Sequence, residues 1–238
     1  MLQERDDGRP DREPILNTPA LVAWTIGILA GIFLIERLLP DESQWALVSS
    51  FGVVPGRYFG AEGLPVSVLP GAWGRLLPLL TYSLLHGSPI HLLLNVVWLL
   101  AIGTPVAQRL GAPRFLLFWA VTAIAAALFY ILLKTDSPAP MIGASGAISG
   151  LFGGLARFMF TRPAAIQVDG SPSESVFGMD RRVLFFAVTW LALNMVVGLS
   201  GFGTEEGASA IAWEAHAGGF MAGLLLFPFF DRSTARIA

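Results

Sequence analysis

The sequence has no cysteine and little charge. Only 13% of its 238 residues are charged, whereas an ordinary soluble domain carries roughly 25%. Without cysteine, disulfide bonds, CxxC redox motifs and thiolate metal sites are excluded. A formal net charge of −2 gives no reason to expect a nucleic acid as partner. What is present instead is apolar, at 54% of residues, and this composition predicts a multi-span membrane protein.

Six apolar segments are long enough, or nearly so, to cross a bilayer. A membrane helix needs about 20 mostly apolar residues. The expected spans are residues 21–36, 86–107, 115–133, 142–160, 183–199 and 209–230. We therefore predict an all-α membrane protein with a single six-helix domain over residues 17–231.

The basic residues predict the orientation of these spans. With the N-terminus inside, the inner segments hold eleven arginines and the outer segments hold three arginines and one lysine. Cytoplasmic loops carry such an excess of basic residues. Residues 1–16 and 232–238 are therefore expected to be cytosolic tails, and both termini to lie in the cytosol.

The two longest loops differ in character. The expected outer loop, residues 38–81, is rich in glycine, proline and aromatic residues, so we expect it to lie partly in the membrane interface. The expected inner loop, residues 161–180, is polar. The sequence shows no internal repeat, and an inverted-repeat transporter therefore has no support.

Polar side chains inside the spans are informative because they are costly there. The chain has only three histidines, His86, His91 and His216. His91 and Asn95 are four residues apart, so on a helix they share one face about one turn apart. They either join helices by hydrogen bonds or take part in a functional site, and the pair alone leaves both open.

Ser145 opens the fourth expected span. At a helix start the first backbone N–H groups have no intrahelical partner, and the positive end of the helix dipole lies there. Both features could stabilise an oxyanion formed on the serine's substrate. Alternatively, Ser145 is an N-cap residue among glycines chosen for close helix packing, since Gly146, Gly150 and Gly154 recur every four residues.

His216 is next to a stripe of small residues in the sixth expected span. Ala215, Gly219 and Gly223 recur every four residues, which predicts a flat surface for another helix. The stripe would bring His216 within reach of that helix. Alone, such a histidine is either a packing residue or a base. Together with Ser145 and the histidine–asparagine pair, it favours a catalytic site.

Three motifs in order make residues 86–223 resemble the rhomboid family of intramembrane serine proteases. The motifs are HxxxN at His91 and Asn95, GxSG from Gly143 to Gly146, and a histidine followed by GxxxG at His216, Gly219 and Gly223. The six spans with both ends inside also resemble the bacterial members. The resemblance thus implies a multi-pass protein of a bacterial inner membrane.

The resemblance also implies a role for each motif residue. Ser145 would be the nucleophile and His216 the general base of a dyad, with His91, Asn95 and the Ser145 backbone N–H as the oxyanion hole. The glycines expected to pack near this site are Gly143, Gly146, Gly219 and Gly223. A serine hydroxyl does need a base, and histidine acts as one near neutral pH. Implied substrates are transmembrane proteins, cut in or next to their membrane segments, with no cofactor or metal.

A third catalytic residue is not expected. An aspartate usually orients the histidine, but none lies in these spans. Glu214 is two positions from His216 and would point to roughly the opposite helix face. Two positions also depart from the family pattern. Family members commonly have an adjacent Trp-Arg pair in the first outer loop, whereas here Gly74 separates Trp73 from Arg75. Ser149 stands where the family often has an aromatic residue that stacks beneath the histidine.

Three other functions are weighed against the protease. A catalytically silent relative that binds membrane helices would lack Ser145 or His216, and both are present. In a histidine metal site, His86 and His91 would point about 140° apart on one helix and would not converge. A small transporter is opposed by the lack of charge in the spans.

Overall fold

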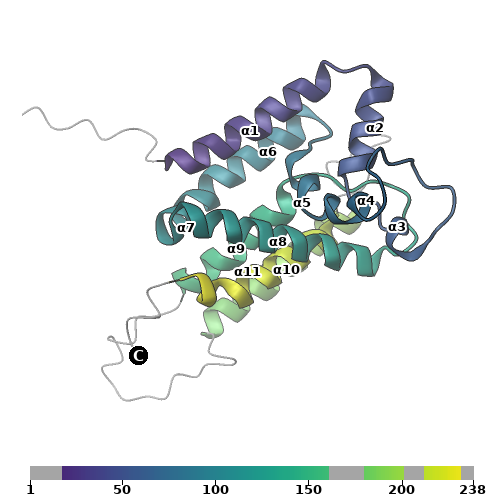
Figure 1. Cartoon of the computed structure of the whole chain (residues 1–238). Helices are drawn as coiled ribbons and strands as arrows, with labels where there is room; N and C mark the ends of the chain where they lie inside the picture. The colour runs from purple at the N-terminus through teal and green to yellow at the C-terminus, as the bar shows by residue number, and fades with distance from the viewer. Residues whose placement is uncertain (1–17, 161–179, 201–211, 232–238) are drawn as a thin grey trace, which may run out of the picture.

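The computed structural model describes residues 18–160, 180–200 and 212–231, and its regular structure is helical (Figure 1). Within these residues the one β-type pairing is an isolated antiparallel bridge between Val53 and Met141. The expectation of an all-α fold is therefore confirmed for the described part of the chain. The expected tails 1–16 and 232–238, and all but the last residue of the expected inner loop 161–180, lie outside it.

Within the described residues, four helical stretches are long and apolar enough to cross a membrane. They are α1 (Ala20–Arg37), the stretch Pro89–Leu110, α8 (Ala112–Leu133) and α10 (Arg181–Ser200). Each overlaps one of the expected spans. The two remaining expected spans, 142–160 and 209–230, contain α9 (Ser145–Met159) and α11 (Trp213–Phe230).

The outward faces of the long helices are apolar. More than half of each side chain is exposed at Leu93, Leu94, Val97 and Trp98, at Leu116 and Leu117 on α8, and at Phe185 and Val188 on α10. Soluble monomers rarely expose apolar patches of this extent, whereas lipid tails accept them at no cost. This surface is that of a multi-pass membrane protein.

The stretch Pro89–Leu110 consists of three parts. It comprises α6 (Pro89–Trp98), a π-helical segment η2 (Leu99–Gly103) and α7 (Thr104–Leu110). The Ser88 hydroxyl accepts a hydrogen bond from the His91 N–H at 3.2 Å, and Pro89 occupies the first turn. Such an N-cap followed by proline is a strong start signal. The helix therefore begins three residues after the expected start at 86, and His86 precedes it.

At the centre of the bundle, α11 packs along α9 and α8 (Figure 1). A Cβ added at Gly219 would overlap the carbonyl oxygen of Gly146, and one added at Gly223 would overlap that of Gly150. Only glycine allows two helix backbones to approach this closely. The contact between α9 and α11 is therefore made by backbone against backbone, which leaves their relative position little freedom.

The expected outer loop, 38–81, is a folded unit. It contains α2 (Asp41–Phe51), α3 (Gly56–Phe59), α4 (Trp73–Leu76) and α5 (Pro78–Thr81), and a 3₁₀ turn η1 (Tyr82–Leu84) follows it. The large aromatic side chains of Trp45, Phe59 and Trp73 are exposed on it. Exposed aromatics of this kind are typical of the membrane interface.

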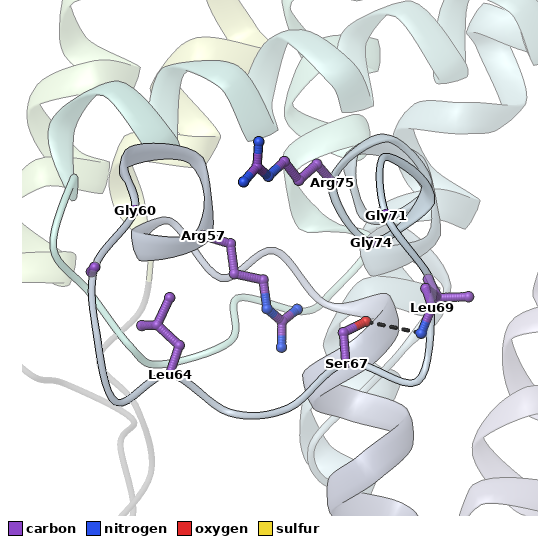
Figure 2. Close-up of a pocket in the computed structure, with 9 residues that line it drawn as sticks. Arg57, Gly60, Leu64, Ser67, Leu69, Gly71, Gly74 and Arg75 are labelled. Carbon is purple, nitrogen blue, oxygen red and sulfur yellow. Dashed lines mark hydrogen bonds between the residues drawn. The ribbon is translucent and has the colours of Figure 1, made fainter.

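Arg57 holds this loop together from inside. Its guanidinium donates to the Ser49 carbonyl at 2.5 Å and to the Pro65 carbonyl at 2.7 Å. Figure 2 shows it in the space enclosed by the loop, beside a cavity of about 280 Å³. The Tyr58 hydroxyl donates to the Arg75 carbonyl at 2.6 Å, and burial raises the pKa of Tyr58 to about 12. These side chains thus donate hydrogen bonds to backbone carbonyls in the short helices of the loop and between them, where regular helical hydrogen bonds run out.

Candidate active site

Ser145 is the first residue of α9, and the chain reaches it through a glycine turn. Gly143 has a φ of +123°, a backbone conformation that residues with a Cβ rarely adopt. Its N–H donates to the Tyr82 carbonyl at 2.9 Å, which ties the turn to η1. The turn thus presents the side chain of Ser145 at the N-terminal end of α9, where unpaired N–H groups gather.

The structure brings Ser145 and His216 into contact. The Ser145 Oγ lies 2.8 Å from the His216 Nε2, although the two residues are 71 positions apart in the chain. Each side chain is half-buried. The glycine contact between α9 and α11 sets this distance, because His216 precedes Gly219 by one turn of α11 and Ser145 adjoins Gly146.

The second nitrogen of the His216 ring also has a partner. Its Nδ1 lies 3.1 Å from the Oδ1 of Asn194 on α10. The amide nitrogen of Asn194 in turn donates to the Trp190 carbonyl at 2.9 Å. Asn194 stands out in the sequence as the single amide in an otherwise apolar stretch, but its sequence position gives no partner. This contact was therefore not predicted.

His91 faces the same turn as Ser145. A Cβ added at Gly143 would lie 2.7 Å from the His91 Nε2 and 3.7 Å from the Ser145 Oγ. Both atoms therefore lie on the same side of Gly143. A side chain at this position would intrude on the space between them, so two separate constraints require glycine at 143.

Asn95 lies one turn further along α6 and is buried. Its amide nitrogen donates to the His91 backbone carbonyl at 2.9 Å, and the spacing of four residues puts the two side chains on one helix face. Among the described residues no hydrogen bond joins Asn95 to Ser145 or His216. Asn95 thus lies one turn along α6 from His91, and its bond to the His91 carbonyl uses only one of its two amide hydrogens.

His86 lies against His91, which corrects the interpretation that the two point apart. That interpretation assumed one helix through both residues, but α6 begins only at Pro89. The two rings meet edge to face with centroids 5.1 Å apart. The His86 Nε2 accepts a hydrogen bond from the Ala144 N–H at 3.5 Å. Over the described residues, no group of three or more potential metal ligands is found.

Glu214 and Ser149 are each close in sequence to one member of the Ser145–His216 pair. The Glu214 carboxylate lies 2.9 Å from the Lys134 Nζ, beyond the end of α8, so it faces away from His216 as its offset of two residues predicts. The hydrogen bond to Glu214 and the negative charge of its carboxylate raise the pKa of Lys134. Ser149 is buried one turn after Ser145 on α9.

This arrangement combines a hydroxyl with a base. An imidazole nitrogen 2.8 Å from a serine Oγ is within the distance that general-base transfer requires. Residues 73–232 match the sequence model of the Rhomboid domain, which is more than half of the chain. The chain belongs to the rhomboid family. The resemblance drawn from the three motifs is thereby confirmed.

This rhomboid is also similar to individual curated proteins. It is 30% identical over 148 residues to RHOMBOID-like protein 4 of Arabidopsis thaliana, which covers 62% of this chain and 32% of the plant protein. It is 38% identical over 97 residues to the rhomboid protease GluP of Bacillus subtilis, covering 41% and 18%. Identity to the rhomboid protease GlpG of an Enterobacter species is 28% over 156 residues, covering 66% and 49%. The chain therefore spans half or less of the length of these relatives.

Proposed function

We propose that this rhomboid is an intramembrane serine endopeptidase that hydrolyses peptide bonds in or next to transmembrane segments. The observation that carries the proposal is the hydrogen bond of 2.8 Å between the Ser145 Oγ and the His216 Nε2. Curated relatives bear the name rhomboid protease. No other pair of nucleophile and base among the described side chains has such a contact.

The proposed reaction begins with proton transfer from Ser145 to His216. As the proton leaves, the serine oxygen bonds to the carbonyl carbon of the scissile peptide and its C=O becomes an oxyanion. His216 then gives the proton to the leaving amine, and the C–N bond breaks. In the second half, His216 takes a proton from water, the hydroxide attacks the acyl-serine, and Ser145 regains its proton.

The oxyanion would be held by donors on three sides. The Ser145 N–H lies at the start of α9, where the helix dipole favours negative charge. His91 lies beside Gly143 on the same side as the Ser145 Oγ. Asn95, bonded to the His91 carbonyl, would orient this region of α6 and supply its remaining amide hydrogen. Donors fixed in advance are worth more in a site of low dielectric.

Water reaches Ser145 from the outer side in this proposal. α9 has 15 residues, so its length is about 22 Å, less than the roughly 30 Å of the hydrocarbon core. A helix this short leaves its N-terminal end below the membrane surface when its other end reaches the opposite side. We also propose that the chain crosses the membrane six times, that both of its termini lie in the cytosol, and that the membrane is a bacterial inner membrane.

The test is cleavage of single-span substrates in liposomes. The wild-type protein should cut members of such a panel, and Ser145→Ala should not, while melting at the same temperature. Chelators should leave the rate unchanged, because the proposed chemistry needs no metal. Persistent cleavage by Ser145→Ala would refute the proposal, and binding of substrates without cleavage by the wild type would favour a helix-binding relative.

A further inference from the structure

We propose that Asn194 is a positioning residue for His216. Its amide oxygen accepts the Nδ1–H of the imidazole and so holds the ring in the tautomer that can act as base toward Ser145. This inference rests on the proposed function, since it names what prepares the base for the reaction. It assigns a role to α10, a helix that carries none of the three motifs.

The tautomer follows from counting protons. A neutral imidazole carries one N–H, and its other nitrogen is an acceptor. To take the serine proton, His216 must keep Nε2 unprotonated, so Nδ1 must carry the hydrogen. That N–H is 3.1 Å from the Asn194 Oδ1, a distance at which it donates a normal hydrogen bond. In the opposite tautomer, Nδ1 would face the oxygen with no hydrogen between them.

The orientation of the Asn194 amide is itself fixed. Its nitrogen donates to the Trp190 carbonyl at 2.9 Å, and a carbonyl cannot pair with the amide oxygen. A flip would set oxygen against oxygen at Trp190 and a donor against the donor Nδ1–H. An asparagine in this position can otherwise present either atom, and the wrong one would select the wrong tautomer. The backbone of α10 removes that ambiguity.

A second contact keeps α10 in register with α11 at this level. The Trp190 ring stacks on Phe220 with centroids 4.4 Å apart and planes 14° from parallel. Trp190 is one helical turn before Asn194, and Phe220 is one turn after His216. The hydrogen bond and the stacked rings are thus two contacts, one helical turn apart, between the same two helices.

A neutral amide suits a base that is half-buried within a bundle. An aspartate would also accept from Nδ1, but an unpaired carboxylate in apolar surroundings is costly. Asn194 gives orientation without net charge. It also gives His216 a support from α10, at a level where Ser149 on α9 offers no aromatic ring.

The experiment compares two near-isosteric variants with a matched control. Asn194→Leu keeps the branched shape of the side chain and loses the acceptor, whereas Asn194→Asp keeps an acceptor oxygen. Leu193→Ala changes the neighbouring residue, whose side chain is exposed on the outer surface of α10. Each protein is assayed in liposomes for kcat and KM on a single-span substrate, and for its melting temperature.

Asn194→Leu should lower kcat by roughly 10- to 100-fold, by analogy with metal-bound histidines, for which loss of the orienting hydrogen-bond partner costs this much. Its KM should stay close to that of the wild type. Asn194→Asp should recover most of the lost kcat, and Leu193→Ala should match the wild type. Equal kcat in Asn194→Leu and the wild type would overturn the inference. A wild type that cleaves no substrate would instead overturn the proposed function.

A spectroscopic measurement covers the case in which Asn194→Leu does not fold. ¹⁵N-histidine NMR of the wild-type protein, with the His216 signals assigned by their loss in His216→Gln, reports which ring nitrogen carries hydrogen. We expect a protonated Nδ1 and an unprotonated Nε2, whether or not a substrate is cleaved. A protonated Nε2 with a bare Nδ1 would overturn the role of Asn194.

Discussion

Replacing Gly219 with alanine should separate α9 from α11 and slow the reaction. The new methyl group would overlap the carbonyl oxygen of Gly146, a backbone atom that cannot rotate aside. The added carbon would lie 2.0 Å from that oxygen, so the helices must move apart by roughly 1.4 Å before the two atoms reach ordinary contact. His216 is on the same helix one turn earlier, so this shift lengthens its hydrogen bond of 2.8 Å to Ser145.

Both consequences have an expected size. Inserting a methyl group into a filled core costs about 1–3 kcal/mol, and each kcal/mol lowers the melting temperature by about 2–4 °C in a protein of this length. A misplacement of reacting groups by about 1 Å can cost roughly 100-fold in rate. Gly219→Ala should therefore lose more activity than its modest loss of stability explains.

The assay measures thermal melting in detergent and cleavage in liposomes on the same preparations. Gly27→Ala is the matched control, because Gly27 also lies on a membrane helix but an added Cβ there meets nothing within 4 Å. It should melt and cleave as the wild type does. If Gly219→Ala behaves in the same way as Gly27→Ala, the two backbones are not in contact and the reasoning fails.

Three further outcomes are expected. His91→Ala and Asn95→Ala should each lower kcat by about 10²–10³ but keep some fluorophosphonate labelling, since the serine N–H remains; wild-type rates in both and in the double variant would mean packing roles. The raised pKa of Tyr58, about 12 against an ordinary 10, stabilises the fold below pH 10, and this stability is lost as pH rises toward 12. Alkaline melting curves of Tyr58→Phe should lack that loss, and identical curves would contradict it. Ser149→Ala should change activity by less than about tenfold, because its hydroxyl is expected to bond a carbonyl of its own helix; a larger loss would place it in contact with the catalytic histidine.

The long spans were predictable because their signal is local. Length and hydropathy alone locate residues 115–133, and the structure has α8 at Ala112–Leu133. The start of the second span was misplaced by three residues. The helix begins at the Ser88 cap and Pro89, although the apolar pattern extends further back. His86 therefore lies outside the helix, and its ring contacts that of His91.

The contacts of the site needed the folded chain. Sequence motifs singled out Ser145 and His216, but their distance depends on where α9 and α11 cross. Asn194 carried no motif at all. Its partner is 22 residues away on another helix, and neither periodicity nor composition reports such a pairing. The orientation in the membrane and the six-span count stay predictions, as they do not follow from packing within the described residues.

Whether Ser145 is the nucleophile can be read from one mass spectrum. The protein is treated with a fluorophosphonate, digested, and searched for the phosphonylated peptide. We predict the adduct on Ser145 in the wild type, none in Ser145→Ala, and a strongly reduced yield in His216→Ala, where the hydroxyl has lost its base. An adduct on another serine, or an undiminished adduct on Ser145 in His216→Ala, would contradict the proposed pairing of nucleophile and base.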